Sequence, residues 1–306
     1  MKVKPWTAAP ILVSAVLILT LIASIIPPSA IGLEDNPYLT TVVLQLAIFM
    51  IPSLFFCTLR GGDYKSSLRL SRPTASSVIF MICALVVMIC GSCVIEYFMS
   101  KIAPVTMAES AAATSAGYAM NRGIFDGLYL VIAFAVLPAV TEEFLFRGII
   151  LSEYSSLGAF CSVFMSSVMF ASCHLSPARF PVYFFCGLVL SLTAYASRSV
   201  IASMILHTLY NVFVLFFEQY VLRLAEKQNI SAVLFMIVAA ACTLLFATIM
   251  CFEGASVYKS YATDNLPSDY APSKSTNGLL SLASAIFSPS FIVLAVIYII
   301  ASLTGN

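Results

Sequence analysis

Residues 125–151 have the sequence FDGLYLVIAFAVLPAVTEEFLFRGIIL. This run is apolar and long enough to cross a bilayer as one helix, because a span needs about 20 residues. Yet Glu142, Glu143 and Arg147 lie within it, and an ionisable side chain inside a bilayer costs on the order of 3 kcal/mol. Such side chains persist where they face other helices or a wet cavity. The stretch therefore predicts a membrane helix that packs inside a bundle and carries a polar site.

The composition of the whole chain is that of a membrane protein. Hydrophobic residues make up 61% of the 306 residues, charged residues make up 9%, and the mean hydropathy is +1.00. A soluble domain carries about 25% charged residues, so most of the outer surface is expected to face lipid. The net charge is only +1, and no basic stripe is present to neutralise phosphates, which argues against a nucleic-acid partner.

Nine apolar stretches are candidates for membrane spans, and they predict an all-α, polytopic transmembrane helical bundle with about eight or nine spans. The stretches are 8–27, 39–58, 75–99, 125–151, 157–175, 179–196, 199–217, 231–252 and 286–303. The first follows Lys2 and Lys4, as in a signal peptide. Its apolar run is long for a signal sequence, so we expect a retained membrane anchor.

Basic residues predict the orientation of these spans. Lysines precede the first span, and the loop at 59–74 is rich in arginine and lysine, whereas the loop between the first two spans carries only acids. The positive-inside rule then places the N-terminus and loop 59–74 in the cytoplasm. Nine spans would place the C-terminus outside, and eight would reverse it. The long polar loop at 253–284 is expected to be a flexible linker.

The nine cysteines all lie in or beside apolar stretches, so no disulfide framework is expected. Cys90 and Cys93 have the spacing of a metal or redox pair, but they stand alone inside an apolar helix. We interpret them as small packing residues.

The acidic residues of the fourth stretch differ in their expected partners. Glu143 and Arg147 are four residues apart and share a helix face, with the acid before the base, which is the favourable order for an ion pair. Glu142 points about 100° away from Glu143. A carboxylate without an ionic partner can serve as a general base. Taken alone, the cluster is explained equally well as a structural ion pair that holds helices in register.

The two histidines favour a functional site. Both lie in apolar spans, where His174 follows Phe170 by four residues and His207 precedes Asn211 by four residues. Each pair therefore shares one helix face. A single buried histidine is as readily a packing residue, but here both histidines of the chain lie in apolar spans, one is paired with Asn at helical spacing, and a Glu-Glu-Arg cluster lies upstream. His and Asn together can donate to an oxyanion, and Glu with His can hold and deprotonate a water molecule.

The chain resembles the CPBP family of intramembrane peptidases. The resemblance rests on three motifs and their order, namely Glu142-Glu143-x-x-x-Arg147, Phe170-x-x-x-His174 and His207-x-x-x-Asn211. That family includes the type II CAAX prenyl endopeptidases and the bacterial Abi proteins, many of them linked to bacteriocin immunity. The resemblance covers about 125–217, which we expect to be a CPBP/Abi-like catalytic helical core. Residues 1–124 would then be N-terminal transmembrane helices, and 218–306 would be C-terminal transmembrane helices with the polar loop 253–284.

The resemblance implies a role for each polar residue. Glu142 with His174 would activate a water molecule for attack on a peptide carbonyl, and His207 with Asn211 would stabilise the oxyanion. Structural and tuning roles would fall to Glu143, Arg147 and Phe170.

The resemblance leaves two mechanisms open, because the family has been described both as glutamate-dependent and as a family of metallopeptidases. Glu142, His174 and His207 are the residue types that bind zinc. However, no HExxH-type pair occurs in the chain and Asn is a poor zinc ligand. We therefore favour a mechanism without a cofactor, with zinc as the alternative.

The partners expected are the lipid bilayer and a peptide or membrane-protein substrate, prenylated and of CAAX type in a eukaryotic host. The location expected is the plasma membrane of a prokaryote. Two other functions are considered. One is a non-catalytic bacteriocin self-immunity or scaffold protein. The other is a transporter in which Glu and His relay protons, but the remaining spans are poor in polar residues, which counts against it.

The depth of the site residues poses a difficulty. In straight antiparallel helices Glu142 and His174 would differ in depth by about 12 Å, at about 1.5 Å per residue. A shared site needs a kinked, tilted or short helix, and Pro138 and Gly148 are the candidates for a break. Glu96 lies near the end of its span and is expected to make an interfacial or helix–helix contact.

Overall fold

The computed structural model describes residues 5–26, 37–61, 68–102, 124–218, 230–263 and 277–304. All secondary structure within these ranges is helical. In chain order the helices are α1 (Pro5–Ile25), α2 (Pro37–Gln45), η2 (Leu46–Met50), α3 (Ile51–Arg60), α5 (Ser77–Ile102), α7 (Ile124–Val131), η3 (Ile132–Val136), α8 (Leu137–Glu143), η4 (Phe144–Ile150), α9 (Leu151–Glu153), η5 (Ser155–Leu157), α10 (Ala159–Cys173), α11 (Phe180–Ser197), α12 (Val200–Phe216), α14 (Ala232–Thr263), α15 (Gly278–Ile286) and α16 (Pro289–Thr304).

The predicted polytopic helical bundle is confirmed. Within the described ranges, six helices are long and apolar enough to cross a membrane, and α15 with α16 make a seventh if this pair, bent by 61°, counts as one span. All nine predicted stretches coincide with helices. Two of these helices, α10 with 15 residues and α12 with 17 residues, are shorter than a full span.

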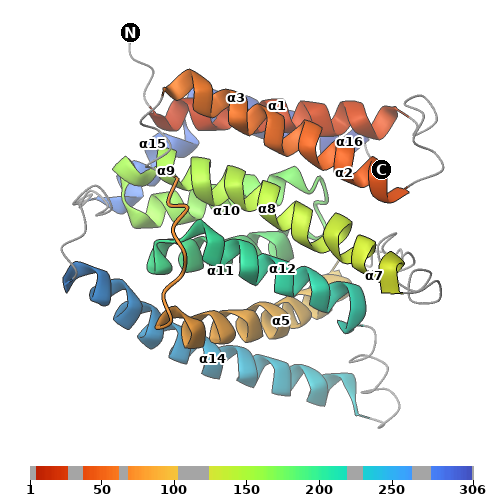
Figure 1. Cartoon of the computed structure of the whole chain (residues 1–306), viewed down its shortest axis with the longest axis vertical. Helices are drawn as coiled ribbons and strands as arrows, with labels where there is room; N and C mark the ends of the chain where they lie inside the picture. The colour runs from red at the N-terminus through yellow and green to blue at the C-terminus, as the bar shows by residue number, and fades with distance from the viewer. Residues whose placement is uncertain are drawn as a thin grey trace.

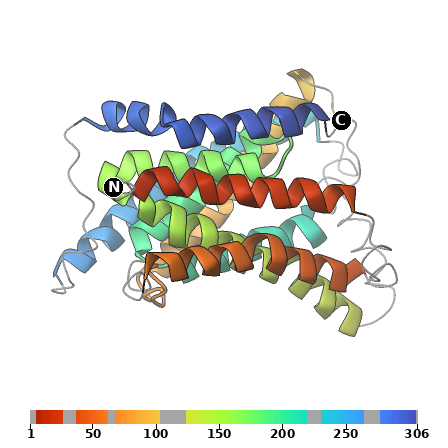
Figure 2. The same cartoon turned by 90° about the horizontal axis from the view of Figure 1, so that it is seen from above.

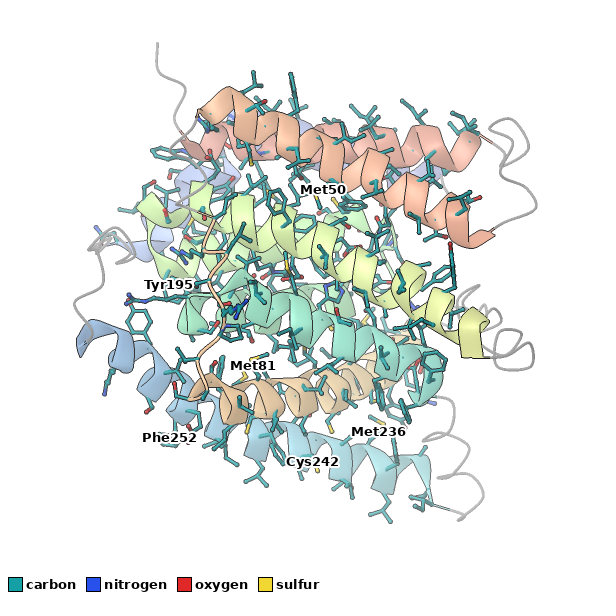
Figure 3. All side chains as sticks on the ribbon, in the orientation of Figure 1. Met50, Met81, Tyr195, Met236, Cys242 and Phe252 are labelled. Carbon is teal, nitrogen blue, oxygen red and sulfur yellow. The ribbon has the colours of Figure 1, made fainter. Side chains whose placement is uncertain are left out.

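The helices are arranged in three tiers (Figure 1). One outer tier holds α1, α2 with α3, and α16; the middle tier holds α7 to α12; and the other outer tier holds α5 and α14. The outer helices carry exposed apolar side chains, as on α14, where Phe252 is 74% exposed (Figure 3). Such a surface is suited to lipid. The middle tier holds the buried ionisable residues Glu142, Glu143, Arg147 and His207.

The two ends of the described chain lie at opposite ends of the bundle. The start of α1 and the end of α16 are on opposite sides in both views (Figures 1 and 2). The predicted loop at 253–284 is shorter than expected, because α14 continues to Thr263 and α15 begins at Gly278. The residues between these helices lie outside the described ranges.

Small residues let the helices of the middle tier approach closely, as is common in membranes. A Cβ atom added at Gly187 of α11 would lie 3.1 Å from both Cα and Cβ of Ser167 in α10. One added at Gly91 of α5 would lie 2.4 Å from the ring of Phe185 in α11. All nine cysteines are free, so these contacts hold the bundle without disulfides, as expected.

Among the described helices, the span Leu39–Arg60 contains one π-helical turn, η2, and the span Gly127–Glu153 contains two, η3 and η4. Pro52 and Pro138 each stand two residues after the end of such a segment. A proline has no N–H, and its ring presses on the carbonyl four residues earlier, and a wider turn relieves this pressure. The N–H of Leu137 accordingly bonds the carbonyl of Ile132, five residues back. The predicted break at Pro138 is therefore a π-helical turn within one continuous span.

Candidate active site

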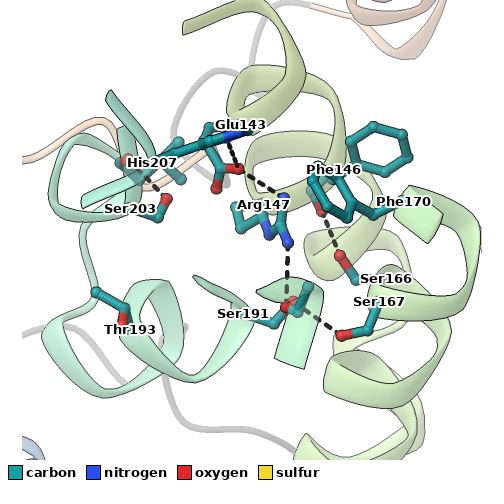
Figure 4. Close-up of polar contacts among 12 residues, drawn as sticks. Glu143, Phe146, Arg147, Ser166, Ser167, Phe170, Ser191, Thr193, Ser203 and His207 are labelled. Carbon is teal, nitrogen blue, oxygen red and sulfur yellow. Dashed lines mark hydrogen bonds and ion pairs between the residues drawn. The ribbon is translucent and has the colours of Figure 1, made fainter. Parts of the chain in front are cut away.

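Glu143 is the centre of the buried polar network. One carboxylate oxygen, Oε1, accepts hydrogen bonds from Arg147 Nη1 at 2.6 Å and from His207 Nδ1 at 2.9 Å (Figure 4). Arg147 also donates through Nη2 to the carbonyl of Gly187 at 3.0 Å. Both Glu143 and Arg147 are fully buried, and buried charges require such partners. The predicted ion pair is confirmed, and the contact of Glu143 with His207 adds a link from α8 to α12.

This contact determines which nitrogen of His207 is available for chemistry. A carboxylate only accepts hydrogen bonds, so the Nδ1 that bonds Glu143 must carry a proton. Nε2 is then the remaining ring nitrogen, and it can donate only when the ring is a charged imidazolium. The oxyanion role implied for His207 therefore requires the charged ring, with Nδ1–H donating to the carboxylate of Glu143.

Phe170 lies between the two histidines. The centroid of its ring is 4.7 Å from that of His174 and 5.8 Å from that of His207. The guanidinium carbon of Arg147 lies 4.5 Å from the same centroid, at a distance suited to a cation–π contact. The ring thus touches three of the predicted site residues, and it fixes their positions relative to one another.

His174 directly follows the last residue of α10. Its Nδ1 lies 2.9 Å from the carbonyl of Phe170, and its ring stacks on that of Tyr183 with centroids 3.8 Å apart. Since a carbonyl only accepts, Nδ1 carries a proton, and Nε2 of the neutral ring is a hydrogen-bond acceptor. His174 also interacts electrostatically with Glu142.

Glu142 faces a different neighbour from Glu143. Its Oε1 accepts a hydrogen bond from Nε2 of Gln45, the last residue of α2, at 3.3 Å. Glu142 is 8% exposed, whereas Glu143 is fully buried. The two adjacent acids therefore point towards different helices, as their angular separation predicts. Gln45 was not among the predicted site residues, although an uncharged amide within the apolar stretch 39–58 is itself a polar signal.

The difference in depth between Glu142 and His174 is smaller than predicted. Glu142 lies 11 residues before the end of α9 at Glu153, and His174 lies 15 residues after the start of α10 at Ala159. The excess of four residues corresponds to about 6 Å. The same count gave about 12 Å from the apolar pattern, because the helix before the turn ends two residues later and α10 begins two residues later than that pattern indicates.

Asn211 connects α12 with the π-helical turn η3. Its Nδ2 donates to the carbonyl of Ala135 at 3.3 Å. A side-chain amide has two N–H groups, so one remains for a ligand. Ser203, one turn before His207 on α12, donates to the carbonyl of Val200 and lies beside Glu143 (Figure 4).

Glu96 takes part in a second polar cluster at one end of the middle tier. It interacts electrostatically with Arg179, at the start of α11, and with Glu218, beyond the end of α12. Burial and the nearby carboxylate of Glu96 raise the pKa of Glu218. Arg179 bonds the hydroxyl of Tyr183, whose ring stacks on His174. Glu96 is therefore linked electrostatically, through Arg179 and Tyr183, to the edge of the site.

The three residues that would bind zinc do not form a metal centre as they are arranged. A zinc site needs three or four protein ligands that converge at about 2.0 to 2.3 Å from one point. Within the ranges that the structure describes, no group of three His, Cys, Asp or Glu side chains converges in this way. Glu142, His174 and His207 thus do not fit a bound zinc in this arrangement.

The sequence from the start of α7 almost to the end of α12 has a match among known families. Residues 124–213 match the sequence model of the family described as Type II CAAX prenyl endopeptidase Rce1-like. No curated protein and no solved structure matches the chain. The matched range contains all the predicted site residues, and it excludes Gln45. Over this range the chain is thus similar to a family of proteases, and its helices are those of a multi-pass membrane protein.

Proposed function

We propose that the chain is a glutamate-dependent intramembrane endopeptidase in which Glu142 and His174 activate the attacking water. The observation that carries this proposal is the different placement of two adjacent carboxylates. Glu143 is bound by Arg147 and His207, whereas Glu142 has no ionic partner within the described ranges and interacts with His174. A general base must be free of a tight ion pair to accept a proton.

The proposed reaction begins with a water molecule between Glu142 and His174. Nε2 of His174 accepts a hydrogen bond from the water and orients it, and Glu142 takes its proton as hydroxide adds to the peptide carbonyl. The negative charge on the carbonyl oxygen is stabilised by Nε2–H of charged His207 and by the second N–H of Asn211. Glu142 then returns its proton to the leaving nitrogen as the peptide bond breaks.

The substrate class that we propose is a peptide segment of a membrane-associated protein, namely a peptide precursor or membrane protein in a prokaryotic host and a prenylated CAAX-type peptide in a eukaryotic one. This class is taken from the matched family. We further propose that the reaction needs no metal and takes place at the plasma membrane of a prokaryote.

The test is cleavage of a prenylated CAAX peptide and a small panel of membrane peptides by the purified protein. We expect Glu142→Gln to lower kcat by about 10² to 10⁴-fold and His207→Ala by about 10² to 10³-fold. Glu253→Gln is the matched control, because Glu253 lies on the outermost helix, α14, and should leave kcat unchanged.

Metal dependence is tested with the same peptides. Incubation with a chelator is expected to leave the turnover of the wild type unchanged. Loss of activity with chelator, restored by added zinc, would contradict the metal-free mechanism. A folded wild type that cleaves none of the peptides would contradict the endopeptidase and favour the non-catalytic binding function.

A further inference from the structure

Gln45 is the described residue whose side chain donates a hydrogen bond to Glu142. It belongs to α2, outside the matched range 124–213, and 97 residues separate the two partners in sequence. The bond joins the first outer tier of the bundle to the middle tier. No role for Gln45 follows from the pattern of the matched region, since that region does not contain it.

The packing of the helices fixes where the amide of Gln45 lies. α2 packs against α8 and η3, and η2 packs against α8 and η4. Gln45 is the last residue of α2 before η2, and Glu143 is the last residue of α8 before η4. Two π-helical turns thus meet beside Glu142, and such turns occur frequently at functional sites.

The chemistry of a neutral donor suits a carboxylate that must act as a base. An arginine or lysine at position 45 would form an ion pair with Glu142 and oppose its protonation. The amide of Gln45 instead holds one oxygen by a neutral hydrogen bond and leaves the carboxylate able to accept a proton. With Oε1 of Glu142 occupied by Gln45, Oε2 is the oxygen that remains for the water.

The length of the hydrogen bond between Gln45 and Glu142 agrees with a contact that shortens when the substrate binds. At 3.3 Å it is longer than the usual 2.7 to 3.2 Å of an N–H···O bond. Catalytic hydrogen bonds are often long without substrate and tighten in the complex.

We propose that Gln45 is a positioning residue that orients the carboxylate of Glu142 towards His174 and its water. This inference rests on the proposed function, because it assigns Glu142 the role of base. Substrate binding does not involve Gln45 in this view, and its removal should therefore change kcat and not KM.

The first experiment compares Gln45→Leu, Gln45→Glu and Leu44→Ala in the full-length protein with the best-cleaved peptide. Leu44 packs against the core from the same helix, so its truncation controls for loosened packing of α2. Gln45→Leu should lower kcat on the order of tenfold with KM within about twofold. Gln45→Glu should lower kcat further, because a second carboxylate would repel Glu142. Leu44→Ala should retain kcat.

Two kinetic results would overturn the proposal. One is an unchanged kcat in Gln45→Leu, and the other is an equal loss of kcat in Leu44→Ala. A wild type that cleaves nothing would instead remove the proposed function, and the positioning role would fall with it.

The second experiment tests the contact without using activity. A double-mutant cycle with Gln45→Leu and Glu142→Leu is followed by the thermal unfolding of the protein in detergent. If the side chains are bonded, the double variant should lose less in Tm than the sum of the two single losses. Additive losses would overturn the contact and with it the proposal.

Discussion

Arg147 makes two hydrogen bonds from a side chain that is fully buried. Replacing it with methionine removes one of the two ionic contacts of Glu143 in the middle of the bundle and leaves only that with His207. Breaking a buried ion pair from one side costs about 3 to 5 kcal/mol. We therefore expect Arg147→Met to unfold at a clearly lower temperature than the wild type in the same detergent, as measured by thermal unfolding.

The matched variant for this prediction is Arg147→Lys, which keeps the charge. A lysine has one nitrogen where arginine uses two, so it cannot reach both Glu143 and the carbonyl of Gly187. It should therefore fall between the wild type and Arg147→Met in Tm. Equal Tm values for all three proteins would contradict the assigned role of the ion pair.

At this scale, sequence spacing predicts only the contacts that a single helix makes. Glu143 and Arg147 are four residues apart, so helix geometry alone brings them together. His207 lies 64 residues from Glu143, and Gln45 lies 97 residues from Glu142. Those contacts depend on which helices are neighbours and on how the helices are rotated relative to each other. The pattern of apolar spans alone determines neither property.

At the scale of whole helices, Gly187 sets the distance between α10 and α11 near the site. A Cβ atom at this position would lie 3.1 Å from the backbone of Ser167, so α11 must shift to accept it. The carbonyl of Gly187 would move with α11 and away from Nη2 of Arg147. Gly187→Ala is therefore expected to lower both Tm and kcat, measured on the same preparation.

Gly127→Ala on α7 is the control for the change from glycine to alanine. A Cβ atom there would have no heavy atom within 4 Å among the described residues. The substitution should leave kcat unchanged and raise stability by about 0.5 to 1 kcal/mol, because alanine favours the helix. Equal losses of Tm and kcat in Gly187→Ala and Gly127→Ala would contradict the role assigned to the close contact at Gly187.

The membrane spans could be predicted from the sequence, because the hydropathy of a helix indicates directly whether it is surrounded by lipid or by water. Their lengths were less predictable, since both the helix before the turn and α10 shift by two residues relative to the apolar pattern. The π-helical turns η2 and η3 left a trace in the sequence only through the prolines that follow them.

For the molecule as a whole, the bundle predicts a definite topology. The start of α1 and the end of α16 lie at opposite ends (Figure 2), and the positive-inside rule places the former in the cytoplasm. A reporter enzyme that is active only outside the cytoplasm should therefore be active when fused after residue 306. Fused after residue 61, which follows α3 at the cytoplasmic end, the same reporter should be inactive. Activity of both fusions, or of neither, would contradict this topology.

The short length of α10 bears on how water, the second reactant of the proposed hydrolysis, reaches the site. Fifteen residues span about 22 Å, whereas the hydrocarbon core of a bilayer is about 30 Å thick. Non-helical backbone follows at His174, and at such a depth it is tolerated only inside protein or beside water. α10 is thus shorter than the hydrocarbon core by about 8 Å in total. For the proposed hydrolysis, the end of α10 at His174 is therefore where we expect water to enter the site.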